Sequence, residues 1–287
     1  AANRVVNDKI RYVIGPVCSG AAIAAAPIYN NEGVVVITPS ATSPALTEGK
    51  NFHFIFRTIG RDDQQGPAAA KFIINKAKPK KVAVLHDKQS YGQGIAASVR
   101  DELKKANVEV ALFEGINAGD SDYSAVITKL KSAGADFVYY GGYHPEMGLL
   151  LRQAAEQGLK VRMMGPEGVG NPEINAIAGN AVEGMLVTLP ADPASKPENA
   201  ALVKAFKDKG RDASGAFQMG AYTATQVLAQ SIKAVGDDAE KVADYLHKTA
   251  FNMPTGNVAW DAKGDLKAFD FPVYSWHKDG SKSVAEK

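Results

Sequence analysis

Four polar regions of the sequence, three of which contain glycine, each follow a short apolar run. They are residues 17–20 (VCSG), 38–44 (TPSATSP), 87–94 (DKQSYGQG), and the two related stretches 141–146 (GGYHPE) and 165–170 (GPEGVG). Hydroxyl groups and the free N–H groups of a helix start attract an anion such as a carboxylate. A recessed acid among small residues, as Glu167 would be, attracts an ammonium group. Together with tyrosines for an apolar wall, these groups describe a site for an amino acid.

Each region also has a simpler structural interpretation. Ser19 could be the N-cap of the helix that begins beside it, and for that region alone this is the stronger interpretation. The hydroxyls of 38–44 could serve only as turn formers, and Glu167 could be a solvated surface acid. The functional interpretation is favoured because ligands bind beside the carboxyl ends of strands in open parallel sheets, where all four regions are expected.

The predicted elements alternate between strands and helices. Short runs rich in β-branched residues predict buried strands at 12–14, 34–37, 82–85, 137–140, 161–164 and 185–187. Helical periodicity predicts helices at about 20–30, 64–78, 92–106, 122–133, 145–157 and 171–178. This alternation indicates an α/β fold with a parallel sheet and helices on both faces.

The last third of the sequence has a different pattern. After residue 190 helices follow one another with hardly a strand between them, and the chain ends on two β segments at 258–260 and 271–276. The stretch 261–265 has turn chemistry, in which Gly264 can take a positive φ. No proline- or glycine-rich linker is present, so two lobes would be joined by strands that pass between them, which favours a hinge.

Length and composition indicate a soluble globular protein with two packed domains. A chain of 287 residues exceeds the usual size of a single core. The sequence is 45% hydrophobic and 22% charged, and it contains no apolar run long enough to span a membrane. Its 33 basic and 31 acidic residues are mixed along the chain, which leaves no basic stripe for a nucleic acid. We therefore expect neither nucleic-acid binding nor direct membrane insertion.

The motifs of common enzyme classes are absent from the sequence. It has no phosphate-binding loop with its lysine, no dinucleotide fingerprint, no Gly-x-Ser-x-Gly elbow and no His-Glu-x-x-His motif. The five histidines lie singly, without metal-ligand spacing, at positions 53, 86, 144, 247 and 277. Cys18 has no basic neighbour in the sequence that would make it a nucleophilic thiolate. The sequence therefore indicates a protein with no catalytic residue, metal or cofactor, and not an enzyme.

The start of the sequence is expected to be cut. Residues 1–8 lack an N-cap and are typical of the last turns of an amphipathic helix, and no signal-peptide pattern precedes them. The single cysteine, Cys18, is either a buried thiol or a residue whose partner is absent.

Six motifs, in this order, resemble one family of proteins. They are YVIGPVCSG, ITPSATSP, HDKQSYGQG, DFVYYGGYHPEMG, GPEGVGNPE and, near the end, WDAKGDLKAFDF. The sequence resembles the leucine/isoleucine/valine-binding proteins of ABC transporters along its whole length. The resemblance implies a type I periplasmic-binding-protein fold, in which a three-strand hinge joins two Rossmann-like lobes. The first lobe would comprise residues 1–59 and 190–269, and the second lobe 60–189 and 270–287.

The resemblance also implies the roles of individual residues. In the first lobe Ser19 and Thr42 would bind the α-carboxylate of the ligand, while the Ser40 carbonyl and the Thr42 hydroxyl would take its ammonium group. Glu167 of the second lobe would complete the ammonium site when the lobes close. The other residues would contact the side chain of the ligand: Tyr91 and Tyr143 from the second lobe, and Val17, Cys18 and Phe217 from the first.

One part of the family pattern is missing from this sequence. The missing part corresponds to about 60 residues, or two βα units, at the start. The first lobe would thereby lack its central strand and the cysteine that pairs with Cys18. Its sheet would then have two unpaired edges.

The function that the resemblance implies is transport. The protein would capture a small aliphatic amino acid in the periplasm by hinge closure, as a monomer, and deliver it to the membrane permease of an ABC transporter. Branched-chain amino acids are the first candidates for the ligand, and alanine, threonine and γ-aminobutyrate are ligands of relatives. A sensor or regulatory domain of the same fold is the alternative. A flavodoxin-like enzyme would need a catalytic dyad or a cofactor loop, which the sequence lacks.

Overall fold

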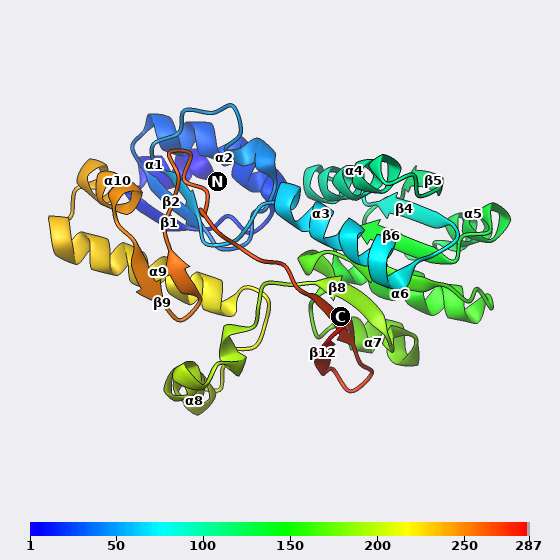
Figure 1. Cartoon of the computed structure of the whole chain (residues 1–287). Coiled ribbons are helices and arrows are strands. Elements are labelled where there is room, and N and C mark those ends of the chain that lie inside the picture. Colours follow the sequence, from blue (N-terminus) through cyan, green and yellow to red (C-terminus); the bar gives the residue numbers. More distant parts are fainter. Residues whose placement is uncertain (286–287) are drawn as a thin grey trace. The chain divides into compact units, whose positions relative to one another are not determined.

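The computed structural model describes residues 1–285, and the chain divides into two compact units (Figure 1). Unit 1 contains Ala1–Arg61 and Ala191–Asp270. Unit 2 contains Asp62–Pro190 and the residues from Phe271 onward. The chain therefore passes between the units three times, and each unit is built from segments that are far apart in the sequence.

A three-stranded parallel sheet forms the centre of unit 1. Its strands lie in the order β1 (Tyr12–Ile14), β2 (Val35–Thr38) and β3 (Ile55–Arg57). Residues of α2 (Ser19–Asn31) pack on one face, and residues of α9 (Gln218–Val235) and α10 (Ala239–Lys248) pack on the other. The sheet is therefore covered on both sides by helices.

The alternation of side chains along β2 explains these two layers. Val36 packs in one cluster with Ala22 and Ala26 of α2, whereas Val35 and Ile37 pack with residues of α9 and α10. All four residues of β2 are buried, as a strand with helices on both faces requires.

The other elements of unit 1 are short. They are α1 (Ala2–Asn7), the 3-10 turns η1 (Pro44–Leu46), η5 (Pro193–Ser195) and η6 (Pro197–Asn199), helix α8 (Ala200–Asp208), and the antiparallel strands β9 (Phe251–Met253) and β10 (Gly256–Val258). Trp260 follows this hairpin and is buried, and its indole N–H donates to the Arg57 carbonyl at 2.7 Å. This bond fastens the late part of unit 1 to β3.

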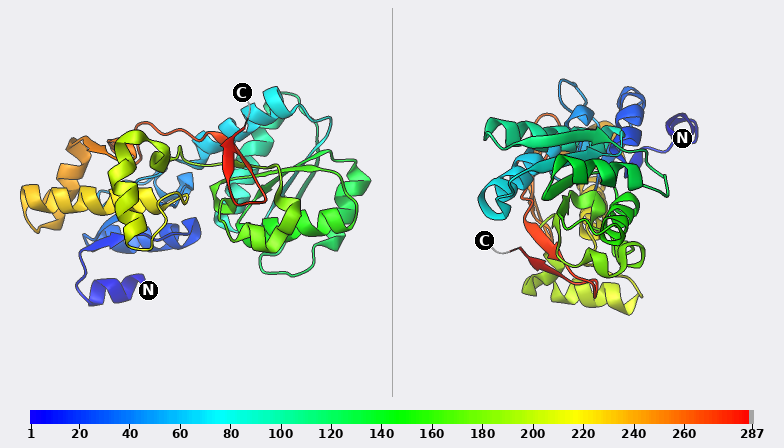
Figure 2. Two further views of the ribbon diagram at one scale, coloured as in Figure 1. Left: turned by 90° about the horizontal axis from the view of Figure 1, so that it is seen from below. Right: turned by 90° about the vertical axis from the view of Figure 1, so that its right-hand side faces the viewer.

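A seven-stranded sheet in the order β12-β11-β8-β7-β6-β4-β5 forms the centre of unit 2. Its parallel strands are β4 (Val82–His86), β5 (Val110–Gly115), β6 (Phe137–Gly141), β7 (Arg162–Gly165) and β8 (Met185–Thr188). The antiparallel strands β11 (Val273–Trp276) and β12 (Lys282–Val284) complete one edge, where Figure 2 shows them in red.

Helices cover both faces of the unit 2 sheet. The helical segments are α3 (Asp62–Phe72), the π-helical turn η2 (Ile73–Ala77), α4 (Ser90–Lys105), α5 (Ser124–Ala133), α6 (His144–Glu156), η3 (Glu167–Val169), α7 (Ile174–Ala178) and η4 (Gly179–Val182). Ala69 of α3 and Val99 of α4 pack in one cluster with Val84 and Tyr139 of the sheet. Helices α6 and α7 lie on the opposite side of the strands (Figure 1).

The predicted alternation of strands and helices is confirmed. Each of the six strands predicted before residue 190 is present, with its ends displaced by at most one residue. The predicted β segment at 271–276 is β11, which begins at Val273, whereas the one at 258–260 overlaps β10 only at Val258. The predicted helix at 64–78 is instead α3 followed by the π-helical turn η2, and the predicted helix at 171–178 begins only at Ile174. Four strands escaped prediction, β3, β5, β9 and β12, because three of them have only three residues and β5 is half-buried throughout.

The start of unit 1 has one unpaired strand edge among the described residues. Residues 2–7 form the short helix α1, and β1 pairs with β2 alone. The side chain of Ile14 at the end of β1 is 38% exposed. At the other edge, the Arg57 N–H of β3 donates to the Gly264 carbonyl at 3.1 Å, so the turn at 261–265 covers that strand end.

The turn that contains Gly264 supplies a test of the packing of unit 1. Gly264 has the predicted positive φ, at 80°, and a Cβ there would lie 1.9 Å from the Ile55 carbonyl oxygen. We expect Gly264→Ala to lower the free energy of unfolding by about 3 kcal/mol or more, because backbone strain and a clash with β3 add together. Urea denaturation followed by circular dichroism measures the loss.

A second glycine separates the two effects. Gly49 also has a positive φ, 66°, but a Cβ there would meet nothing within 4 Å. Gly49→Ala should therefore cost only about 1 kcal/mol, from conformational strain alone. Equal losses for the two variants would contradict the close approach of Gly264 to β3.

Candidate functional site

Side-chain hydrogen bonds hold the two polar segments of unit 1 side by side. The hydroxyl of Thr38, the last residue of β2, donates to the Pro16 carbonyl at 2.7 Å and accepts the Ala41 N–H at 3.0 Å. The hydroxyl of Ser40 donates to the Val17 carbonyl at 2.9 Å. Each of the two segments follows a strand of the sheet, and these bonds fix one segment against the other.

Ser19 takes part in the same arrangement. Its hydroxyl is buried and accepts the Ser43 N–H at 3.2 Å. The N-cap of α2 is Cys18, and no side chain caps this helix, so the interpretation of Ser19 as an N-cap serine is wrong. Thr42, next to Ser43 in the sequence, is also buried. The structure therefore brings Ser19, Ser40 and Thr42 into one cluster beside the start of α2.

The start of α2 gives this cluster the electrostatics of an anion site. The helix has 13 residues and carries no basic or acidic side chain in its first or last turn. Its first-turn N–H groups have no intrahelical partners, and the helix dipole adds partial positive charge at this end. Hydroxyls and N–H groups together can bind a carboxylate.

The residues expected to line the apolar wall of unit 1 differ in exposure. Val17 is 61% exposed. Cys18 is also exposed, with a free thiol, so its interpretation as a buried thiol is wrong. Phe217 is half-buried and immediately precedes α9. The first turn of α9 lies against the residues that follow β2 and β3. A Cβ on Gly220 would lie 3.5 Å from the Pro39 carbonyl after β2, and the Gly220 carbonyl accepts the hydroxyl of Thr58, after β3, at 3.0 Å.

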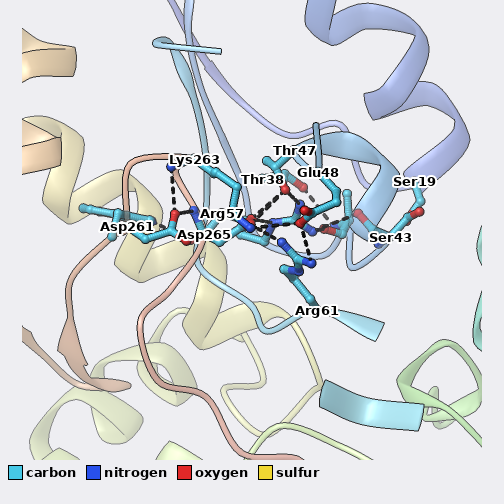
Figure 3. Close-up of polar contacts among 12 residues, drawn as sticks. Ser19, Thr38, Ser43, Thr47, Glu48, Arg57, Arg61, Asp261, Lys263 and Asp265 are labelled. Carbon is cyan, nitrogen blue, oxygen red and sulfur yellow. Dashed lines mark hydrogen bonds and ion pairs between the residues drawn. The ribbon is translucent and has the colours of Figure 1, made fainter. Parts of the chain in front are cut away.

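A buried ion pair between Arg57 and Asp265 holds the Ser40–Ser43 segment in place. Arg57 of β3 has no exposed surface, and its Nε lies 2.7 Å from Asp265 Oδ1 (Figure 3). One terminal nitrogen of Arg57 donates to the carbonyls of Ala41 and Ser43, at 2.8 and 3.2 Å. These are the two carbonyls that flank Thr42, so the position of Thr42 depends on the guanidinium.

Asp265 in turn joins several other polar groups of unit 1. The Thr47 hydroxyl accepts a hydrogen bond from Arg57 at 2.8 Å and donates to Asp265 at 2.9 Å. The Arg61 guanidinium lies 2.6 Å from Asp265 Oδ2 and 2.9 Å from Glu48 (Figure 3). Lys263 and Arg61 lower the pKa of the exposed Glu48 carboxyl by hydrogen bonding to it. Sequence reasoning missed this network, since nothing in the local sequence links β3 to the turn at 261–265.

Two tyrosines of unit 2, Tyr91 and Tyr143, lie close to each other. The ring centroids of Tyr91, at the start of α4, and Tyr143, just before α6, are 5.2 Å apart. The Tyr91 hydroxyl accepts the Gly168 N–H at 3.1 Å. A Cβ on Gly168 would lie 2.7 Å from the Gly142 carbonyl and 2.9 Å from the Tyr91 ring, so only glycine allows these loops to approach so closely.

Glu167 is a recessed acid of unit 2, and its interpretation as a solvated surface residue is wrong. Its side chain is only 2% exposed. Its N–H donates to Gln65 Oε1 at 3.1 Å, and the same oxygen accepts the Thr188 hydroxyl at 2.6 Å. The Gln65 amide also reaches the buried carboxylate of Asp62, at 3.4 Å. Gln65 and Asp62 lie in the first turn of α3, where the sequence predicts only an amphipathic helix.

The carboxylates of Glu167 and Asp62 act on two nearby tyrosines, Tyr91 and Tyr139. Burial raises the pKa of Tyr91 well above its ordinary value, and the carboxylates of Glu167 and Asp62 raise it further. The same three causes, in the same order, raise the pKa of Tyr139 of β6. Both phenols are therefore neutral at physiological pH, and the carboxylates that disfavour a phenolate here would favour a cation such as an ammonium group.

Asp87 starts the segment that leads from β4 into α4. It is 2% exposed, and its Oδ1 accepts the Gln89 N–H at 2.9 Å. Burial raises the pKa of Asp87 to about 6, and the nearby carboxyl of Glu146 raises it as well, against the hydrogen bond from Gln89, which lowers it. This acid therefore titrates in the folded protein near neutral pH.

The fold and these sites define a class of protein. The family model described as "Periplasmic binding protein" matches residues 1–281, and the chain belongs to this family. No helix within residues 1–285 has the length and apolar character needed to cross a membrane.

The curated relatives narrow the class. The chain is 56% identical over 283 residues to the leucine-, isoleucine-, valine-, threonine- and alanine-binding protein of Pseudomonas aeruginosa, covering 98% of this chain and 76% of the relative. It is 48% identical over 285 residues to the Leu/Ile/Val-binding protein of Escherichia coli K12, covering 99% of this chain and 77% of the relative. The resemblance to the leucine/isoleucine/valine-binding proteins is therefore confirmed.

Solved structures show the same fold. A leucine-binding protein of Thermotoga maritima superimposes with a TM-score of 0.89 at 31% identity, covering 99% of this chain and 82% of that one. A branched-chain amino-acid transporter substrate-binding protein of Streptococcus pneumoniae, in complex with isoleucine, gives 0.87 at 27% identity with the same coverage. The fold is that of the type I periplasmic binding proteins, as predicted.

The ion pair beneath Thr42 leads to a prediction about stability. Arg57→Met would remove the fully buried cation of this network and leave Arg61 as the close cation beside Asp265, and we expect a loss of about 3 kcal/mol in the free energy of unfolding. Lys204→Met is the matched control in unit 1, because Lys204 and Asp208 form an exposed pair at 2.6 Å whose removal should change little. Chemical denaturation measures both, and a small loss for Arg57→Met would show that the network does not support the loop.

The raised pKa of Asp87 leads to a prediction about pH. The pKa of Asp87 is about 6 in the folded protein, against 3.8 for an ordinary aspartate. The protonated carboxyl therefore stabilises the fold fully below pH 3.8, and this contribution is lost as the pH rises through about 6. The wild type should therefore lose up to about 3 kcal/mol relative to Asp87→Asn between pH 4 and pH 7.

Melting temperatures of both proteins across this range test the prediction. Asn keeps a side-chain oxygen that can accept the Gln89 N–H, so the two proteins differ chiefly in the titrating group. A stability difference that does not change with pH would contradict a raised pKa of Asp87.

Proposed function

We propose that this protein binds a small aliphatic L-amino acid, foremost leucine, isoleucine or valine, and supplies it to a transporter. The observation that carries the proposal is the pair of complementary polar clusters. Ser19, Ser40 and Thr42 gather beside a helix start in unit 1, and Glu167 is buried beside two neutral tyrosines in unit 2. One cluster suits a carboxylate and the other an ammonium group, and an α-amino acid carries both.

The individual contacts follow from this complementarity. Ser19 and Thr42 bind the α-carboxylate through their hydroxyls, and the Ser40 carbonyl with the Thr42 hydroxyl takes the ammonium group. Glu167 adds a charge-assisted bond to the same ammonium group when the ligand draws the two lobes together. The lobes are 1–59 with 190–269 and 60–189 with 270–287, joined by three chain crossings that act as a hinge.

The apolar wall determines the ligand class. Tyr91 and Tyr143 cover the side chain of the ligand from one lobe, and Val17, Cys18 and Phe217 from the other. No charged side chain stands in this proposed wall, so an aliphatic side chain gains from burial while a charged one would lose its hydration. The curated relatives are named for binding leucine, isoleucine and valine, which supports this ligand class.

The proposed place in the cell follows from the family. The protein acts in the periplasm as a monomer, delivers its ligand to the membrane permease of an ABC transporter, and leaves the amino acid chemically unchanged. The relatives named as binding proteins support transport over a sensory role and over an enzyme.

Calorimetric titration of the chain with each of the twenty amino acids tests the proposal. Leucine, isoleucine and valine should release heat with one site per chain, alanine and threonine should bind more weakly, and charged amino acids should not bind. The amino acid should be recovered intact after incubation, as mass spectrometry can check. Absence of heat with every amino acid would overturn the proposal.

Substitution of Glu167 tests the ammonium contact. Glu167→Gln keeps the size of the side chain but removes its charge, and it should weaken leucine binding by about 30-fold or more, as for other buried charge pairs. Glu173→Gln is the matched control, because Glu173 is a 76% exposed acid of the same unit that pairs with His144 at 3.2 Å. Unchanged affinity in Glu167→Gln would remove Glu167 from the site.

A further inference from the structure

A second cluster of chemically active side chains lies elsewhere in unit 1. His53 precedes β3, and Glu240 and Asp244 lie four residues apart on α10. One ligand atom from each of these three residues falls within 4.8 Å of the other two. The sequence could not indicate this cluster, because His53 lies almost 200 residues before the helix that supplies the acids.

The distances within the cluster fit a metal better than a hydrogen bond. His53 Nε2 lies 3.3 Å from Glu240 Oε1 and 3.5 Å from Asp244 Oδ1. A charge-assisted hydrogen bond between such groups is usually about 2.7–2.9 Å long. Two ligand atoms that each lie about 2.0–2.1 Å from a tetrahedral zinc ion are about 3.4 Å apart, which matches both distances.

The imidazole nitrogen is placed as a ligand would be. His53 Nε2 is shielded from solvent, has no hydrogen-bond partner among the described residues, and lies between the two carboxylates. Both carboxylate oxygens lie within ion-pair distance of this nitrogen but beyond the usual length of a hydrogen bond. A metal ion between the three groups would satisfy the nitrogen.

Neighbouring residues hold the three groups in place. The His53 N–H donates to Asn30 Oδ1 at 2.8 Å, and His247 Nε2 lies 3.0 Å from the His53 carbonyl. The two imidazole rings stack with their centroids 5.1 Å apart. Lys248 pairs with Asp244 Oδ2 at 3.1 Å, so that the other oxygen, Oδ1, is the one that faces His53. Such outer contacts orient ligands in known metal sites.

We propose that His53, Glu240 and Asp244 bind a divalent transition-metal ion of the zinc class. One imidazole and two carboxylates suit zinc, nickel or copper better than calcium or magnesium, which prefer oxygen ligands alone. Water supplies the fourth ligand, since a solvent-open cavity of about 560 Å³ is lined by His53, Asp244 and His247. The bound ion links α10 to the segment before β3 and stabilises unit 1.

Titration of the metal-free chain with zinc chloride, in a buffer that does not chelate zinc, tests the proposal. We expect one zinc ion per chain, a rise in melting temperature on binding, and intense visible absorption bands of tetrahedral cobalt when Co²⁺ replaces zinc. Glu240→Gln and His53→Gln should each weaken zinc binding by at least about tenfold. Glu240 is 68% exposed, so its substitution leaves the fold intact and the result interpretable.

The matched control is His277→Gln. His277 also pairs with an acid, Glu183 at 2.9 Å, but its other ring nitrogen contacts the Ser283 hydroxyl instead of a second carboxylate. Zinc binding should be unchanged in this variant. Two outcomes would overturn the proposal: no zinc binding by the wild type at millimolar metal, or binding that His53→Gln leaves unaltered. The site shares no residue with the amino-acid contacts, so either outcome leaves leucine binding to be judged on its own titration.

Discussion

The buried ion pair between Arg57 and Asp265 is the interaction on which the polar cluster of unit 1 depends. A guanidinium without exposed surface is costly to desolvate, and the cost is offset only if its N–H groups find good acceptors. Arg57 finds them in the Asp265 carboxylate, the Thr47 hydroxyl and two carbonyls of the loop after β2. The same bonds that satisfy the guanidinium therefore determine the path of the loop that carries Thr42.

The two units position their polar residues by different physical means. Unit 1 uses charge and hydrogen bonds, since Arg57 and Thr38 reach the backbone of the loop after β2. Unit 2 uses close approach of backbones, because at Gly92, Gly141 and Gly168 any Cβ would lie less than 3 Å from a neighbouring atom. Arg57 and Thr38 position a loop by the hydrogen bonds of their side chains. The glycines of unit 2 allow neighbouring backbones to approach because they have no side chain.

Sequence reasoning could reach the strands and the loops that follow them, but not the residues that hold those loops. The apolar composition of residues 35–37 and 82–85 predicts buried strands. Because ligand residues follow strands in such sheets, Ser40 and Tyr91 are then indicated as site residues. Gln65 could not be found in this way. It meets Glu167 across 102 residues of sequence, and its local pattern is that of any amphipathic helix. The pairing of Arg57 with the turn at 261–265 is equally non-local, and the role of Gly264 beside it was visible only as turn chemistry.

The electrostatics of unit 2 explain why an acid is buried there at all. Glu167 and Asp62 are each 2% exposed, and both act on Tyr91 and Tyr139 by repelling a negative charge on the phenols. A protein optimised for stability alone would gain by replacing such carboxylates with apolar groups. Buried carboxylates are understandable in a site that binds a cation, as the proposed function requires. In the proposed function, Glu167 would make a charge-assisted contact with the ammonium group of the ligand, and a neutral side chain at position 167 could not provide it.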